Sequence, residues 1–227
     1  MKTSKPLAIA LAALTALALL TGAVAAPILC RPFYYAHIGP LRLAERTGYT
    51  EGEIKTAFDE MLDYCLGGEE FSTGAMRWSE SGKSHFTDVR RLFLLDLRAF
   101  AAALAALACL GLLARRGGMG PAPLLGRGPG FWAGAGLGGV FLLVGALAAL
   151  DFDRAFVVFH ALFFPGKDNW LFDPAADQII NILPQAYFRN CALLIFALLV
   201  LGCALLIGLD FCHGSGRSKI LHKNEKF

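Results

Sequence analysis

Residues 190–209 read NCALLIFALLVLGCALLIGL, and this uncharged stretch indicates how the whole chain is built. A helix of ~20 apolar residues is long enough to cross the ~30 Å hydrocarbon core of a bilayer. Two further runs, Pro6–Leu29 and Gly128–Leu150, have the same character. The composition agrees, because 56% of the residues are hydrophobic and the mean hydropathy is +0.54. Such values are unusual for a water-soluble domain.

A fourth candidate span, Leu92–Leu113, carries Asp96 and Arg98 near its start. Charged groups are less unfavourable in the interface than at the bilayer centre, so we expect the first turns of this helix in the interface. The first apolar run is expected to be an uncleaved anchor. It exceeds the ~7–15 residues of a signal-peptide core, and Pro27 follows directly after the small residues AVAA.

These patterns predict an all-α integral membrane protein, a four-transmembrane-helix bundle with an extracellular cap. Whether the cap contains short strands is left open by the sequence. The predicted parts are a first span at 7–29, an extracellular cap at 30–91, a second span at 92–113, a cytoplasmic loop at 114–130, a third span at 131–150, short extracellular or interfacial helices at 151–188, a fourth span at 189–209 and a cytoplasmic tail at 210–227.

The distribution of charge predicts which side of the membrane each part faces. Basic residues dominate both termini and the loop after the second span, namely Lys2, Lys5, Arg115, Arg116, Arg127, Arg217, Lys219, Lys223 and Lys226. Acidic residues outnumber basic ones in the other two segments. The positive-inside rule therefore predicts a multi-pass protein of the cell membrane with cytoplasmic termini. The net charge of +3 lies on the cytoplasmic side and does not indicate nucleic-acid binding.

The predicted cap contains one clear helix, which begins after Thr50. Thr50 and Glu53 form a capping-box pattern, and Gly67 with Gly68 marks the helix end. Apolar residues recur at helical spacing, namely Ile54, Ala57, Phe58, Met61, Leu62 and Cys65. The fold of residues 66–83 is left undecided. Cys30 and Cys65 are the two cysteines that could meet in an oxidising space, and their redox state is also left open.

An aromatic stretch, FHALFFPGKDNWLFDP at residues 159–174, follows the third span. Four Phe and one Trp surround His160, and Pro165 with Gly166 predicts the end of a helix. Asp173 as an N-cap, followed by Pro174 as the first residue, predicts a second short helix. Such a density of rings exceeds what interfacial anchoring needs, which favours a hydrophobic, aromatic pocket at this boundary.

Two histidines, His85 and His160, belong to the boundary between membrane and cap. His85 lies near the predicted N-terminus of a long helix, where the helix dipole and desolvation disfavour imidazolium, whereas Asp88 favours it. His160 among phenylalanines is also expected to be neutral, which is the useful state for a general base. The alternative is a purely structural role, which is the more common one for a lone histidine at an interface.

Several known site motifs are absent from the sequence. It contains no HExxH, GxSxG, P-loop or dinucleotide fingerprint, so neither a metal nor a cofactor is expected. Two other functions are compatible with a small membrane protein of this kind. One is a non-enzymatic small membrane transporter or lipid-binding protein, which the uncharged first, third and fourth spans argue against. The other is a membrane metal-dependent hydrolase that would use His37, His85 and His160.

Two motifs, SHFTDVRRLF (84–93) and FHALFFPGKDNWLFDPAADQIINILPQAYF (159–188), resemble the lipoprotein intramolecular transacylases. These are bacterial membrane enzymes with four spans and an extracellular cap, and the order of spans agrees over nearly the whole chain. The resemblance implies an acyltransferase that moves the sn-2 acyl chain of a diacylglyceryl-cysteine lipoprotein to the cysteine α-amino group, which gives the N-acyl lyso-form. Its partners would be diacylglyceryl-modified lipoproteins and membrane lipid, with no nucleic acid.

The resemblance also implies site residues. The family's two histidines correspond to His85 and His160, which are expected to be catalytic at the outer face of the membrane. Supporting or orienting roles are expected for Asp88, Arg90 and Asp173. The expected substrate-binding residues are Phe86, Phe159, Phe163, Phe164, Trp170, Phe172 and Tyr187.

Overall fold

The computed structural model describes residues 2–224, with side chains described for residues 2–212. The chain divides into two compact units. The first unit comprises Met1–Ala23, Arg98–Ala146 and Phe196–Phe227, and the second comprises Val24–Leu97 and Leu147–Ile195. Of the basic tail residues, Lys226 lies outside the described residues, as do the side chains of Arg217, Lys219 and Lys223.

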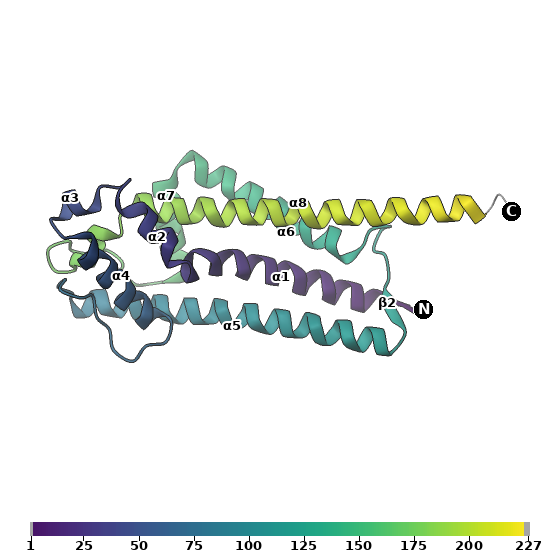
Figure 1. Ribbon diagram of the computed structural model, residues 1–227, viewed down its shortest axis with the longest axis horizontal. Helices are drawn as coiled ribbons and strands as arrows, with labels where there is room; N and C mark the ends of the chain where they lie inside the picture. The colour runs from purple at the N-terminus through teal and green to yellow at the C-terminus, as the bar shows by residue number, and fades with distance from the viewer. Residues whose placement is uncertain (1, 225–227) are drawn as a thin grey trace. The chain divides into compact units, whose positions relative to one another are not determined.

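The chain is mostly helical (Figure 1). Its elements are, in chain order, β1 (Lys2–Ser4), α1 (Lys5–Leu29), α2 (Arg31–Ile38), α3 (Leu43–Thr47), α4 (Glu51–Cys65), α5 (Glu80–Arg116), β2 (Met119–Pro121), α6 (Pro129–Leu150), α7 (Phe152–Phe163), the 3₁₀-helix η1 (Gln178–Ile182) and α8 (Gln185–Asn224).

Four helices are long and apolar enough to cross a membrane, namely α1, α5, α6 and the Gln185–Cys212 part of α8. The predicted fold class, a helical membrane protein with four apolar helices, is therefore confirmed. Helix α5 begins at Glu80 and so extends well before the predicted span at 92–113. The strands among the described residues lie outside segment 30–91: β1 pairs in parallel with β2, with Lys2 opposite Met119.

Small residues let the helices of the first unit approach closely. A Cβ atom added to Gly134 in α6 would lie 2.8 Å from the carbonyl oxygen of Cys203 in α8. A Cβ atom added to Gly202 in α8 would lie 2.5 Å from a methyl group of Leu19 in α1. In lipid, helix association depends on this kind of close van der Waals packing, because hydrocarbon tails supply no hydrophobic driving force between helices.

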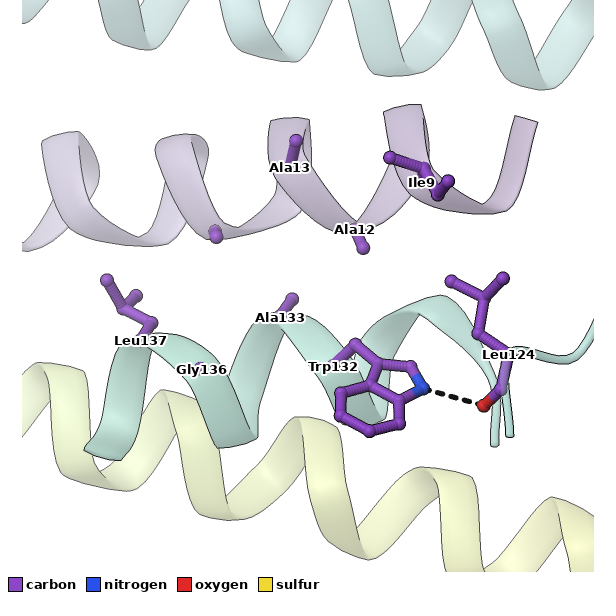
Figure 2. A pocket seen from close by; sticks show the side chains of 9 residues that line it. Ile9, Ala12, Ala13, Leu124, Trp132, Ala133, Gly136 and Leu137 are labelled. Carbon is purple, nitrogen blue, oxygen red and sulfur yellow. Dashed lines mark hydrogen bonds between the residues drawn. The ribbon is translucent and has the colours of Figure 1, made fainter. Parts of the chain in front are cut away.

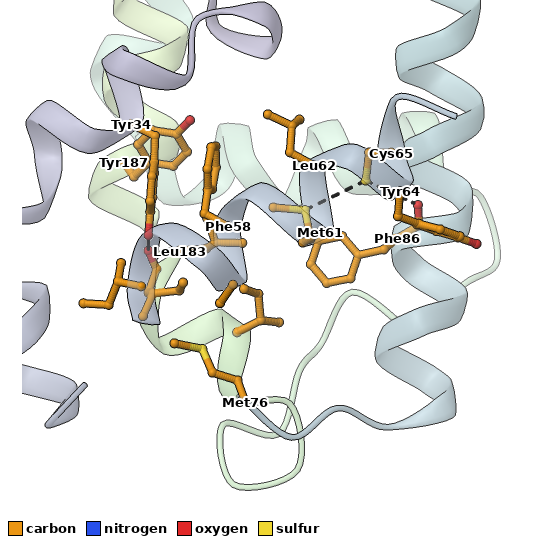
Figure 3. Close-up of a cluster of buried hydrophobic side chains, with 14 of the residues drawn as sticks. Tyr34, Phe58, Met61, Leu62, Tyr64, Cys65, Met76, Phe86, Leu183 and Tyr187 are labelled. Atoms are coloured by element: carbon orange, nitrogen blue, oxygen red, sulfur yellow. Dashed lines mark hydrogen bonds between the residues drawn. The ribbon is translucent and has the colours of Figure 1, made fainter. Parts of the chain in front are cut away.

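The second unit has its own aromatic core (Figure 3). The predicted capping box of Thr50 and Glu53 is present at the start of α4, and the predicted apolar face of α4 is buried. The ring of Tyr34 in α2 stacks on Phe58 in α4, with centroids 3.7 Å apart and planes 7° apart. The Tyr34 hydroxyl donates a hydrogen bond to the carbonyl oxygen of Ile182 at 2.9 Å, which ties α2 to η1.

The predicted helix with its N-cap at Asp173 is wrong, because residues 174–176 form turns and the helix found is η1. The Asp173 carboxylate accepts a hydrogen bond from the backbone N–H of Ala175, which closes a local turn instead. Asp177 accepts from the backbone N–H and the hydroxyl of Ser79, at 2.7 and 2.8 Å. Cys30 is exposed, Cys65 is buried, and both are free thiols.

We expect replacement of Tyr34 by Phe to lower the free energy of unfolding by roughly 1–3 kcal/mol, because the buried carbonyl of Ile182 would lose its partner. Thermal unfolding of the purified protein in detergent measures the change. Tyr35→Phe is the matched control, since the Tyr35 hydroxyl bonds to the partly exposed Asp59. An equal loss of stability in both variants would contradict this assignment.

Candidate active site

Helices α5 and α7 bring two histidines together in the second unit. His85 lies in the second turn of α5, and His160 lies in the last turn of α7. Their ring centroids are 5.9 Å apart and their planes make an angle of 27°. Both are buried, with only 6% and 7% of their surfaces exposed. Two imidazoles that are remote in sequence therefore face each other within the apolar interior.

His160 is held in one tautomer by its own helix. Its Nδ1 lies 2.8 Å from the carbonyl oxygen of Phe156 one turn earlier. Because a carbonyl oxygen only accepts, Nδ1 carries the hydrogen and Nε2 keeps its lone pair in the neutral ring. Burial lowers the pKa of His160 below its ordinary value of 6.5, and the hydrogen bond to Phe156 acts in the opposite direction with a smaller effect.

His85 has aromatic neighbours but no hydrogen-bond partner for one nitrogen. Its ring centroid lies 4.9 Å from that of Phe164 and 5.3 Å from that of Phe172. Within the described part of the chain, its buried Nδ1 and the buried Oδ1 of Asn169 make no hydrogen bond of standard geometry, although the Asn169 side chain lies close enough to interact with the His85 ring. Asn169 lies beside this turn of α5, since its Nδ2 is 3.3 Å from the hydroxyl of Ser84. Unpaired buried polar atoms are rare in native proteins and often mark a functional site.

The carboxylate of Asp88 joins α5 to the loop that follows α7. Both of its oxygens lie 2.6 Å from Nζ of Lys167. Asn169 donates to the same carboxylate at 3.1 Å, and Arg91 does so at 3.3 Å. Asp88 is only 7% exposed, so dissolved salt screens the attraction between Asp88 and Lys167 less than it would screen a fully exposed ion pair. Asp88 thus holds the loop 165–170 beside His85.

Aromatic rings enclose the histidine pair. Trp170 stacks on His160 with centroids 4.5 Å apart and planes 28° apart, and its indole N–H donates to the carbonyl of Lys167 at 3.1 Å. Phe164 is buried and contacts both imidazoles. Phe86 packs against Phe172, with ring centroids 5.7 Å apart. These rings leave an apolar environment around the two histidines.

The start of α5 is fixed just before His85. Asp177 binds Ser79 at the helix N-terminus, where a carboxylate interacts favourably with free backbone N–H groups. Gly82 lies against this carboxylate, and a Cβ atom added there would be 2.1 Å from Oδ1 of Asp177 and 3.2 Å from the ring of Phe172. Gly82 therefore permits a close approach that larger residues would prevent.

Several residues expected at the site lie elsewhere or at its edge. Arg90 donates hydrogen bonds to the carbonyl oxygens of Gly67 and Gly68, and its guanidinium lies 4.9 Å from the ring centroid of Tyr64. Asp173 closes the turn described above. Neither residue is hydrogen-bonded or ion-paired to His85 or His160 in the described part of the chain. Their positions therefore favour a role in holding the backbone.

The expected substrate-binding aromatics fall into separate groups. Phe159 contacts the edge of His160 at 5.4 Å and packs against Phe163, but the two rings are 47% and 46% exposed. Tyr187 is buried in the core instead, where its ring lies 5.1 Å from that of Tyr34. Phe86, Phe164, Trp170 and Phe172 surround the histidines as described above.

Sequence reasoning missed Lys167 and Asn169. Both stand in GKDN at residues 166–169, directly after the Pro165-Gly166 break. A run of polar residues between Phe164 and Trp170 was the available signal. This signal alone could not show the role of Lys167, because its partner, Asp88, lies far away in the sequence.

His37, the third histidine of the metal-hydrolase alternative, belongs to the aromatic core. Its Nδ1 lies 2.6 Å from the carbonyl oxygen of Phe33, and its ring contacts Tyr187. Among the described residues, no group of three or more His, Cys, Asp or Glu side chains is arranged to hold a metal ion. The structure therefore offers no support for a site built from all three histidines.

The family model described as Lipoprotein intramolecular transacylase Lit matches residues 9–188. The chain belongs to this family. The family's name denotes acyl transfer with lipoproteins as substrates, so the resemblance of the two motifs is confirmed and acyltransferase activity follows at the level of the family. The transporter and metal-hydrolase alternatives gain no support.

Solved structures show the same fold. The chain is similar to the membrane-integral lipoprotein intramolecular transacylase Lit from Bacillus cereus, with a TM-score of 0.79 and 22% identity over 94% of this chain and 96% of that chain. Two variants of that protein, in which one histidine is replaced by arginine or alanine, give TM-scores of 0.74 and 0.75 at 22% and 21% identity. They cover 94% of this chain and 92% and 94% of theirs. No curated protein sequence matches the chain.

We expect Asp88→Asn to release the loop 165–170, because the substitution removes the negative charge that holds Lys167. Hydrogen exchange of the amides in this loop should become faster by roughly tenfold or more, equivalent to ~1.4 kcal/mol of local stability. Arg91→Gln is the control, since Arg91 is an exposed partner of the same carboxylate. Equal exchange in wild type and Asp88→Asn would contradict the role of the ion pair.

Proposed function

We propose that this Lit-family protein moves the sn-2 acyl chain of a diacylglyceryl-cysteine lipoprotein to the α-amino group of the same cysteine. The product is an N-acyl lipoprotein in the lyso-form. The observation that supports this reaction best is the pair of buried imidazoles with centroids 5.9 Å apart. Two neutral bases side by side suit a reaction in which an amine must lose protons while an alkoxide leaves.

The proton balance explains why two histidines are useful. The substrate amine begins largely as an ammonium group, since an α-amino group has a pKa of ~7.7–8.0. It loses one proton to become a nucleophile and a second as the new N–C bond becomes an amide. The ester C–O bond breaks, the glyceryl alkoxide takes one of these protons, and the other leaves to solvent. Each of the two imidazoles can accept one of these protons. One of the resulting imidazolium groups can then donate its proton to the alkoxide.

The unpaired atoms beside α5 suggest which histidine meets the amine. In the proposed tautomer of neutral His85 the hydrogen is on Nε2 and Nδ1 keeps its lone pair. This Nδ1 and the Oδ1 of Asn169 are both buried, and neither makes a hydrogen bond of standard geometry among the described residues. An amine that donates its N–H groups to both atoms would satisfy them and place its proton next to His85. His160, whose Nε2 is free because Nδ1 binds Phe156, would then serve the ester oxygen. No covalent enzyme intermediate is needed.

The surroundings suit an acyl ester and disfavour water. Phe164, Phe172 and Trp170 cover the imidazoles, and the half-exposed Phe159 and Phe163 present an apolar face on α7 for the chain that moves. Exclusion of water would protect the ester from hydrolysis. Amine and ester belong to one molecule, and well-oriented intramolecular reactions reach effective molarities of ~10⁵ M or more.

We further propose that the protein crosses the cell membrane with spans at 7–29, 92–113, 131–150 and 189–209. Both termini and the loop 114–130 would face the cytoplasm, since their basic residues follow the positive-inside rule. Segments 30–91 and 151–188 would then lie outside, and the histidine pair would stand at the outer face. This side is where a lipoprotein anchored by its diacylglyceryl group presents its N-terminal cysteine.

We expect His85→Gln and His160→Gln each to lower conversion by at least ~10²-fold, which is the typical contribution of a general base. Cells that lack the usual lipoprotein N-acyltransferase would express each variant. Mass spectrometry of a model lipoprotein's N-terminal peptide would then measure the N-acyl product. His37→Gln is the matched control and should retain most activity, since His37 lies in the aromatic core. A wild-type protein that folds but leaves the diacylglyceryl peptide unchanged would contradict the reaction.

The lowered pKa of His160 predicts how the site responds to acid. Its imidazole should remain neutral below pH 6.5, with Nδ1 protonated, when followed by NMR of ¹⁵N-labelled histidine. An unfolded chain takes up this proton at ~6.5, so the unfolded state binds more protons and the fold loses stability as pH falls through that value. A midpoint at or above 6.5 for His160 would show that burial does not control this ring. The NMR signal of His160 is assigned as the one that disappears from the spectrum of the His160→Gln variant.

A further inference from the structure

An apolar groove runs between α1 and α6 in the first unit (Figure 2). Its volume is about 390 Å³, which lies in the size range of ligand sites. On the α1 side it is lined by Ile9 and by alanines, including Ala12. On the α6 side Trp132 closes one end, where its indole N–H donates to the carbonyl oxygen of Leu124 at 2.8 Å. The lining residues are apolar, apart from the indole N–H of Trp132, which already has its partner, so the groove suits an apolar ligand.

The groove begins next to basic residues that have no ion-pair partner in the described part of the chain. Lys5 lies one helical turn before Ile9, on the same face of α1. Lys2 in β1 pairs with Met119 in β2, which places it close to the end of α5. That end carries Arg115 and Arg116, and all four basic residues are exposed.

Among residues 2–224, the first unit offers these cations no carboxylate that is without a partner. Asp210 is its single acidic residue among residues 2–224. The Asp210 carboxylate already accepts a hydrogen bond from the backbone N–H of Gly128 at 2.8 Å and pairs with Arg127 at 3.4 Å. A ligand for this region therefore needs a negatively charged head and an apolar tail.

We propose that the groove binds an acyl chain of an anionic phospholipid, whose phosphate headgroup lies against Lys2 and Lys5. Charge complementarity favours this occupant, because each Lys or Arg near an anionic lipid surface contributes ~1 kcal/mol. Small residues keep the groove open. Gly136 lines it, and a Cβ atom added there would meet no other atom within 4 Å. This lipid site is separate from the histidine pair and does not depend on the transfer reaction.

Native mass spectrometry of the full protein in detergent tests the proposal. The protein would be titrated with phosphatidylglycerol and with phosphatidylcholine that carry the same acyl chains. Wild type should bind phosphatidylglycerol about thirtyfold more tightly, as expected for two lysine contacts. The double variant Lys2→Gln/Lys5→Gln should lose this preference. Equal binding of both lipids by wild type would overturn the headgroup assignment.

Two glycine variants test the groove itself. Gly136→Leu adds a bulky side chain at a lining position where an added Cβ meets no atom within 4 Å, and it should weaken binding of both lipids by about tenfold. Gly139→Leu is the matched control, because Gly139 lies on the same helix, also has no atom within 4 Å of an added Cβ, and does not line the groove. Ala12→Leu fills the groove from α1 and replaces Gly136→Leu if that variant does not fold. Unchanged lipid binding in a folded groove-filling variant would overturn the site.

Discussion

The buried carboxylate of Asp88 holds the candidate site together. It stands on α5 and binds Lys167 and Asn169, which follow the end of α7. A buried carboxylate without partners would be strongly unfavourable, so the chain between α7 and η1 is constrained to bring its polar groups to this point. Once Lys167 is fixed, its backbone carbonyl oxygen accepts a hydrogen bond from the indole N–H of Trp170. The Trp170 ring in turn stacks on His160. A single ionic contact thereby orders the aromatic wall of the site.

The two histidines occupy unequal environments although both are buried. His160 has its Nδ1 occupied by the carbonyl of Phe156, so its tautomer is set by the helix that carries it. The buried Nδ1 of His85 makes no hydrogen bond of standard geometry to the described residues, and the side chain of Asn169 lies beside this ring. In a low-dielectric setting, unpaired atoms of this kind interact strongly with any donor that enters. In the reaction proposed above, this asymmetry would give the two imidazoles different parts.

Local patterns made much of this structure predictable from the sequence. Long apolar runs, three of them without charge, predict the four apolar helices, because a bilayer admits little else. Thr50 with Glu53 predicts the start of α4. His160 stood out through its aromatic neighbours. Lys167 and Asn169 did not, since their role depends on a carboxylate almost eighty residues earlier. The helix predicted after Asp173 does not form for a similar reason, because Asp177, four residues later, accepts a hydrogen bond from Ser79 on a distant segment.

Gly82 lies so close to Asp177 and Phe172 that even a small side chain at this position would displace them. The carboxylate of Asp177 and the ring of Phe172 occupy the volume that any side chain at position 82 would need. One methyl group there would push against the anchor of α5 and against a ring that touches His85. A position that takes no part in chemistry therefore leaves no room for a side chain in this arrangement of Asp177 and Phe172.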